Sequence, residues 1–143
     1  MLPIYNSAEE FFKANEAPMK EIGASNTKLM SMSELMTTGD VLTKCDELSY
    51  EFLRLMNVVS QIRLGLTASV IRAKEGVKTT EGVIYRALEG SATEKKMLIP
   101  SMQEHVTASD KLADLTDISD YLQQKYEAFQ SAHVYYKNLA SRR

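Results

Sequence analysis

The chain has almost no cysteine, little proline and glycine, and no long apolar run. Its 143 residues include one cysteine, three prolines, six glycines and no tryptophan. The single Cys45 excludes an internal disulfide and a cysteine-based zinc site, and we expect it to be a buried core residue. No apolar run reaches the roughly eighteen residues that a membrane-spanning helix needs. The N-terminal "MLPIYNSAEEFF" lacks the basic-then-apolar pattern of a secretory signal. We therefore expect a cytoplasmic protein with no membrane partner, in the host cytoplasm if a phage encodes it.

Signatures of catalysis are also missing. The sequence contains no Walker loop, dinucleotide fingerprint or nucleophile elbow. His105 and His133 are not at a metal-ligand spacing from each other or from Cys45. The aspartates between Asp110 and Asp120 are spaced so that they lie on one side of a helix, where paired carboxylates could hold a divalent cation. No second acidic motif on another element supports such a site, so we interpret these aspartates as a solvated helix face. We expect a protein that is not an enzyme, with no catalytic residues, no metal and no cofactor.

What the sequence does contain is helical periodicity. From Asp40 to about Lys74, apolar side chains recur at alternating spacings of three and four, which predicts one long helix ending at Glu75–Gly76. The stretch that begins near Thr107 repeats the pattern and predicts a second long helix. We assign these apolar seams to the core or to contacts between subunits. Their main members are Leu48, Phe52, Leu55, Val59, Ile62, Leu122, Phe129, Tyr136 and Leu139.

Short helices are expected around the two long ones. Ser7 and Glu10 have the spacing of a capping box, which predicts a helix start, and Pro18 limits or bends that helix. The stretch "SNTKLMSMSELM" favours a second short helix. Gly39 and Asp40 then predict a stop followed by a new helix cap.

Two further short elements are predicted between the long helices. "KTTEGVIYRALEG" is typical of a short helix that closes at Gly90, and "SATEKKMLIPSMQEH" of another that is interrupted at Pro100. The expected fold is all-α: two long helices pair antiparallel, short helices pack on them, and apolar seams support oligomers. We divide the chain into an N-terminal helical arm, residues 1–39, and a helical core domain, residues 40–143.

The positive charge is concentrated in the middle of the chain. Residues 1–51 carry nine acids and four bases, a net charge of −5; residues 52–96 carry four acids and eight bases, a net charge of +4; residues 97–143 have a net charge of −1. Such a basic stretch indicates an anionic partner, with nucleic acid as the first candidate. A helix face that is charged only for solubility is the alternative interpretation. Tyr85, beside Arg86, is one possible group for stacking on a base, and Tyr135–Tyr136 is another. The candidate DNA-binding residues are Arg63, Arg72, Lys74, Lys78, Arg86 and Lys95.

Several segments together suggest a family. "TEKKM" is followed by "HVTASDKL", which opens a helix, and then by the aromatic-rich "YLQQKYEAFQSAHVYYKNLASR". Ahead of them, "IRLGL" and "IRAKEGVK" supply a basic segment on a long helix. In this order, over roughly residues 50–143, the chain resembles the phage UvsY-type recombination mediators. The N-terminal "MLPIYNSAEEFFKANEAPMKEIGASNTK" has no counterpart in that pattern.

This resemblance implies a specific function. Such proteins bind single-stranded DNA without sequence preference, form ring-like homo-oligomers and help to load a RecA-like recombinase onto DNA covered by single-strand-binding protein. By position, Arg63, Arg72, Lys74 and Lys78 would contact the DNA, with Arg86 and Lys95 as further candidates. Two other functions fit the residues. One is a helical adaptor or inhibitor, such as a phage protein acting on a host machine, which would dock through Phe11–Phe12. The other is a structural component of an assembly.

Overall fold

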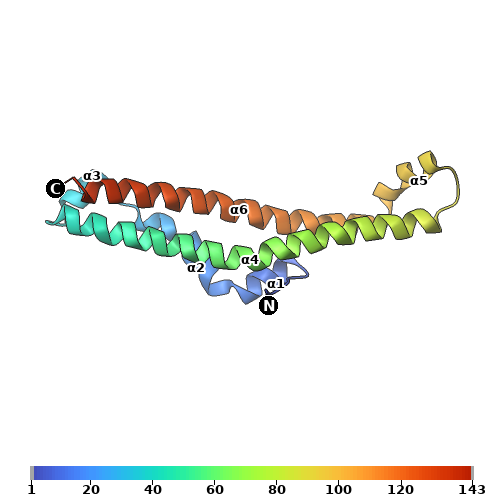
Figure 1. Ribbon diagram of the computed structural model, residues 1–143, viewed down its shortest axis with the longest axis horizontal. Helices are drawn as coiled ribbons and strands as arrows, with labels where there is room; N and C mark the ends of the chain where they lie inside the picture. The colour runs from blue at the N-terminus through green and yellow to red at the C-terminus, as the bar shows by residue number, and fades with distance from the viewer. Residues whose placement is uncertain (1, 143) are drawn as a thin grey trace. The chain divides into compact units, whose positions relative to one another are not determined.

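The fold is all-α, as predicted. The computed structural model describes residues 2–142 and, within them, contains helices and no strand (Figure 1). The elements are α1 (Ala8–Ala14), α2 (Glu16–Gly23), the 3-10 helix η1 (Ser25–Lys28), α3 (Met32–Met36), α4 (Val41–Ala87), α5 (Ala92–Leu98), the 3-10 helix η2 (Ile99–Ser101) and α6 (Gln103–Ala140). No helix of this described part is long and apolar enough to cross a membrane.

The chain forms two compact units, and both long helices contribute to each of them. Unit 1 comprises residues 2–14 and 64–120, and unit 2 comprises residues 15–63 and 121–142. Within each unit a segment of α4 packs antiparallel to a segment of α6, which confirms the predicted pairing. The short helices α1, α5 and η2 belong to unit 1, and α2, η1 and α3 belong to unit 2. The predicted arm of residues 1–39 is therefore shared between the two units.

Local sequence signals account for most helix starts. The Ser7 hydroxyl accepts the Glu10 amide at 3.2 Å, while the Glu10 carboxylate accepts the Asn6 amide rather than the Ser7 amide. Half of the predicted capping box is thus formed. A complete box that we did not predict begins α3, where Ser31 and Glu34 satisfy each other's backbone donors.

The start of the long helix agrees with the prediction. Gly39 has a φ of +80°, in the region that favours glycine, and ends the preceding segment. The Asp40 carboxylate then accepts the Thr43 amide at 3.1 Å, as an N-cap residue does.

The predicted end of the long helix is wrong. Helix α4 does not stop at Glu75–Gly76 but continues to Ala87, so "KTTEGVIYRALEG" is not a separate helix. A glycine inside a helix costs only about 1 kcal/mol relative to alanine, and tertiary packing offsets this cost. Ala73 and Ile84 are both buried, and their separation of about three turns keeps one face of the helix on the core.

The connection between the long helices follows the prediction more closely. The chain leaves α4 through Gly90, whose φ is +115°. Pro100 lies in η2, which interrupts the helical path after α5 as expected. Helix α6 begins at Gln103, a few residues before the predicted start near Thr107.

Unit 2 has an aromatic core. The rings of Phe52 and Tyr136 stack with centroids 5.9 Å apart, and Phe129 approaches Phe52 at 6.0 Å. Most predicted seam residues are buried, so within this chain they serve the core of unit 2; these are Leu48, Phe52, Leu55, Val59, Leu122, Phe129 and Tyr136. Ile62 and Leu139 are only partly buried. Cys45 is buried as expected, and this burial raises the pKa of its thiol.

Unit 1 has a thinner core, which the N-terminal segment helps to close. Phe11 is fully buried and meets the Tyr5 ring edge-to-face at 5.2 Å. The Tyr5 amide donates to the Ser69 hydroxyl on α4 at 2.7 Å. One turn earlier on α4, a Cβ atom added at Gly65 would lie 2.8 Å from Pro3. The glycine therefore allows the extended N-terminal segment to lie directly against the helix.

Candidate nucleic-acid interface

The six predicted DNA-binding residues do not form one cluster. Arg63 belongs to unit 2, and the other five belong to unit 1. On α4, Lys74 and Lys78 lie one turn apart on one side of the helix. Arg72 and Arg86 lie about four turns apart on another side, and Arg72 is roughly 160° around the helix from Lys74. Helical geometry therefore separates the lysines from the arginines.

The lysines share their side of the helix with an aromatic ring. Tyr85 follows Lys78 by about two turns and points the same way. From α5, Lys95 places its Nζ 4.6 Å from the centroid of the Tyr85 ring, which is a cation–π contact. We call this group of Lys74, Lys78, Tyr85 and Lys95 the lysine face. Lys74 and Lys78 are exposed, whereas Tyr85 and Lys95 are half-buried.

The amines of the lysine face have no acidic partner within the described residues. The ion pairs found there involve other bases, and none includes Lys74, Lys78 or Lys95. The nearest acid on this side of α4 is Glu81, whose carboxylate is hydrogen-bonded to His105 of α6 at 2.9 Å. The three ammonium groups are thus available to an anionic ligand.

The other predicted bases are less well placed. Arg72 and Arg86 are exposed, but the Arg86 Nε donates to the Gly82 carbonyl at 3.3 Å, so its guanidinium folds back along the helix. Glu75 lies one turn from Arg72. Arg63 is half-buried, and its Nε is a buried atom with no hydrogen-bond partner among residues 2–142. That position is unlike the exposed position expected of a phosphate contact.

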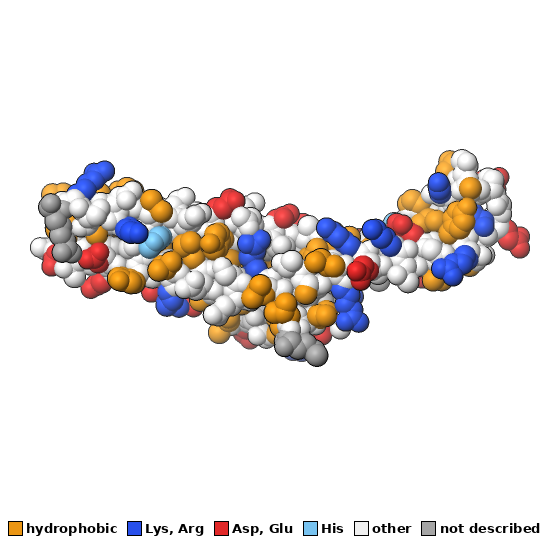
Figure 2. All heavy atoms as spheres, in the orientation of Figure 1, with side chains coloured by type: hydrophobic (Ala, Val, Ile, Leu, Met, Phe, Trp, Pro, Cys, Tyr) orange, Lys and Arg blue, Asp and Glu red, His pale blue; other side chains and the backbone are white. Residues whose placement is uncertain are grey.

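Charge is also divided between the long helices of unit 1. Residues 64–98 carry six bases and four acids, whereas residues 103–120 carry one base and five acids. The net charge is therefore +2 on the segment of α4 and α5 and −4 on the segment of α6. Figure 2 shows Lys and Arg side chains over α5 and the adjoining part of α4, with carboxylates among them.

The acidic side chains of α6 agree with a solvated helix face. Asp110, Asp114, Asp117 and Asp120 follow one another at helical spacing, and all four are exposed. Within the described part of the chain, no group of three or more potential ligands is positioned to hold a metal ion.

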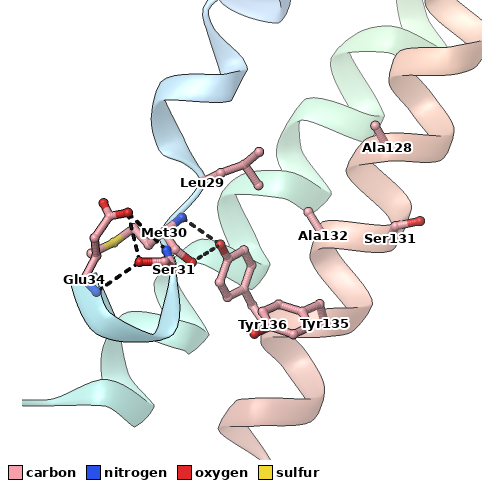
Figure 3. A pocket seen from close by; sticks show the side chains of 9 residues that line it. All are labelled: Leu29, Met30, Ser31, Glu34, Ala128, Ser131, Ala132, Tyr135 and Tyr136. Atoms are coloured by element: carbon pink, nitrogen blue, oxygen red, sulfur yellow. Dashed lines mark hydrogen bonds between the residues drawn. The ribbon is translucent and has the colours of Figure 1, made fainter. Parts of the chain in front are cut away.

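Unit 2 contains a surface pocket that sequence reasoning missed (Figure 3). It has a volume of about 530 Å³ and is lined by residues 29–31 and 34 on one side and by α6 on the other. The Tyr136 hydroxyl fixes the first side: it accepts the Met30 amide at 2.8 Å and donates to the Met30 carbonyl at 3.0 Å. Residues 29–31 have no periodicity that could have predicted this contact.

An ion-pair network in unit 2 was also missed. The guanidinium of Arg54 binds both Glu21 and Glu51, and Lys28 binds Glu51 as well. The hydrogen bond from Arg54 is the largest cause that lowers the pKa of Glu51, from its ordinary value of 4.5 to about 2. The same guanidinium lowers the pKa of Glu21. The network ties α2 and η1 to α4 and leaves Arg54 and Lys28 with partners of their own, unlike the lysine face.

The histidines have structural partners. His133 Nδ1 lies 2.8 Å from the Ser49 carbonyl and 3.0 Å from its hydroxyl. His105 pairs with Glu81 as described above.

No protein-family model, curated protein or solved structure matches the chain. The resemblance to UvsY-type mediators therefore remains a prediction from the residues.

Proposed function

We propose that this protein binds single-stranded DNA through the lysine face, as a non-catalytic recombination mediator that helps to load a RecA-like recombinase. The observation that supports the proposal is the lysine face itself, which combines an aromatic ring with three amines that have no acidic partner among residues 2–142. Grooves that bind single strands without sequence preference use the same two elements, positive charge for the backbone and aromatic rings for the bases.

The strength of such binding depends on the number of subunits. Each phosphate neutralised on a single strand contributes about −0.7 to the slope of log affinity against log salt concentration. Three lysines in one chain give a slope of about −2 on that basis, which corresponds to weak binding. A homo-oligomer would present several lysine faces to one strand and raise the overall affinity through effective concentration.

The proposed oligomer needs surfaces other than most of the predicted seam, because those residues are buried within the chain. Apolar side chains that remain exposed are candidates for contacts with a second copy, with the recombinase or with single-strand-binding protein. Those with the greatest exposure are Met97 at 76%, Tyr50 at 74%, Met36 at 68%, Leu64 at 57% and Val83 at 57%.

The same exposed side chains favour the second candidate, a helical adaptor that binds proteins only. Its predicted docking segment, Phe11–Phe12, presents just one of the two rings: Phe11 is fully buried and Phe12 is 47% exposed. Under this alternative the lysine face would be a solvated surface, and its mutation would not affect partner binding.

Fluorescence anisotropy with a labelled single-stranded oligonucleotide at several salt concentrations separates the two functions. We expect affinity to fall with salt and to be similar for different base compositions. The double variant Lys74→Gln/Lys78→Gln should reduce the magnitude of the salt slope by about 1.4. The control Lys125→Gln/Lys137→Gln removes the same charge from α6 in unit 2 and should leave the slope unchanged. Absence of binding at low salt, or equal effects of the two double variants, would overturn the proposal.

A further inference from the structure

The contact between Lys95 and Tyr85 suggests a conformational change within the proposed DNA-binding site. We propose that Lys95 is a removable cover for Tyr85: when single-stranded DNA binds, the lysine leaves the ring for a phosphate and an unpaired base stacks on the ring in its place. This inference rests on the proposed function and adds to it a conformational step and a preference for unpaired bases.

The fold holds the helix that carries Lys95 without using the lysine itself. Gly90 turns the chain after α4, and the Glu94 carboxylate occupies the space beside it, since a Cβ atom at Gly90 would lie 2.6 Å from a Glu94 oxygen. The Ser91 hydroxyl caps α5 by accepting the Glu94 amide at 3.2 Å. Because these contacts position α5, the Lys95 side chain can swing away while the helix stays in place.

The cover itself is held weakly. The only contact of the Lys95 ammonium that the structure displays within the described residues is the one with the Tyr85 ring, 4.6 Å from its centroid. A cation–π contact at a partly exposed site changes an equilibrium by about two- to fivefold. Stacking of a base on an aromatic side chain changes a binding constant by about 5- to 150-fold.

These magnitudes decide which ligand can open the site. A ligand with both phosphates and unpaired bases replaces the cation–π contact with a stronger stack and gives the released ammonium an anionic partner. A polyanion without bases offers the ammonium a partner but leaves the ring with nothing to replace the lysine. The ring should therefore make the site prefer unpaired bases over bare sugar-phosphate backbone, while Lys74 and Lys78 contribute equally to both.

The absence of tryptophan makes the ring directly observable. The variant Tyr85→Trp would contain a single tryptophan, at the position of the proposed stack. Its emission can be followed while an oligothymidylate is added, and again while an abasic oligonucleotide of the same length is added. We expect the oligothymidylate to quench the emission and the abasic strand to leave it nearly unchanged, although both bind. Binding itself is measured in parallel by anisotropy with labelled strands.

The chain offers a matched control for this experiment. Tyr121 in unit 2 lies under the ammonium of Lys125 at 5.8 Å, which is the same kind of pair at a distance from the lysine face in sequence. The variant Tyr121→Trp should show no quenching with either strand. Quenching of the two tryptophans to the same extent would indicate a general effect of bound DNA and would overturn the inference.

A second set of variants tests the same step by affinity. Tyr85→Phe keeps a ring and should retain a preference of at least about fivefold for oligothymidylate over the abasic strand. Tyr85→Leu keeps an apolar side chain without a ring and should lose that preference while retaining its affinity for the abasic strand. Circular dichroism confirms that both variants are folded.

The outcomes separate this inference from the function on which it rests. If the wild-type protein binds both strands equally and the emission of the Tyr85→Trp variant does not respond, the cover does not open for a base, although the proposed binding of the DNA backbone survives. If neither strand binds at low salt, the proposed function fails and the inference fails with it.

Discussion

In both units a segment of α4 packs against a segment of α6, but the side chains between the two helices differ. In unit 2 the facing segments of α4 and α6 meet through Phe52, Phe129 and Tyr136, and charged side chains are joined in a network around Arg54. In unit 1 the corresponding part of α4 buries smaller side chains such as Ser69 and Ala73, and the amines of its lysine face have no acidic partners within the described residues. We therefore expect unit 2 to be the more stable part of the fold. In unit 1 the ammonium groups of the lysine face are not engaged in ion pairs within the described residues. Binding surfaces are commonly drawn from the less stable parts of a protein.

The largest expected effect tests the aromatic core of unit 2. Phe52→Ala should lower the free energy of unfolding by about 3–5 kcal/mol, because truncation of a buried aromatic side chain removes its contacts and leaves a cavity. Urea denaturation followed by circular dichroism measures the change. Tyr50→Ala is the control, since Tyr50 is 74% exposed, and it should alter stability by less than about 0.5 kcal/mol. Equal losses in the two variants would contradict the assignment of the core.

The next effect contrasts two glycines of α4. At Gly65 an added methyl group meets Pro3 at 2.8 Å, so Gly65→Ala should push the N-terminal segment off the helix and destabilise the protein by about 1–3 kcal/mol. At Gly76 nothing lies within 4 Å, so Gly76→Ala should stabilise by about 0.5–1 kcal/mol through helix propensity alone. Thermal denaturation gives both signs, and limited proteolysis should cut residues 2–14 faster only in the first variant. A stabilising Gly65→Ala would show that the segment does not pack there.

A comparison of two sides of α4 refines the DNA-binding site within unit 1. Lys74→Gln/Lys78→Gln and Arg72→Gln/Arg86→Gln each remove two positive charges from the same helix. If the lysine face carries the binding, the lysine pair should flatten the salt slope by about 1.4 and the arginine pair by clearly less. Anisotropy titrations at matched salt concentrations test this. Equal slopes for the two variants would mean that DNA contacts both sides of the helix.

The smallest effect concerns acid stability in unit 2. Because the pKa of Glu51 is lowered from 4.5 to about 2 in the folded protein, its contribution is present above pH 4.5 and is lost as the pH falls towards 2. The side chains of Arg54 and Glu51 are 46% and 31% exposed, so screening by solvent limits this contribution to about 1 kcal/mol. Arg54→Gln should therefore reduce stability at pH 7 slightly and flatten its decline between pH 4.5 and 2. Lys20→Gln, which removes an exposed helix pair, should leave the pH profile unchanged.

The sequence was sufficient for the parts of this fold that depend on periodicity. The spacing of Leu48, Phe52, Leu55 and Val59 predicted a buried face, and the structure buries it. The prediction that the helix ends at Gly76 failed, because the cost of a glycine in a helix is small compared with the packing of Ala73 and Ile84 on the core. A rule that considers only neighbouring residues could not include the stabilisation that this tertiary packing gives to the helix.

The candidate site was predictable only in part, for a similar reason. Lys74 and Lys78 are recognisable from the sequence as neighbours on one helix face. The position of Lys95 over Tyr85 depends on how the turn at Gly90 directs α5, which spacing does not determine. Charge counting grouped Arg72 with these lysines although it lies on another side of α4. The network of Arg54 with Glu21 and Glu51 joins segments far apart in the chain, so no local pattern indicated it.

The hydrogen bonds between Tyr136 and Met30 have a consequence for how the protein is made. They join residues 106 positions apart, and the stack of Phe52 on Tyr136 likewise spans most of the chain. A nascent chain leaves the ribosome from its N-terminus, so residues 15–63 are synthesised long before their partners on α6. Until those partners emerge, Phe52 lacks the rings of Phe129 and Tyr136 that it meets in the folded chain. Unit 2 therefore completes its folding only after α6 has been synthesised, and until then the first half of α4 is the segment that we expect a chaperone to bind.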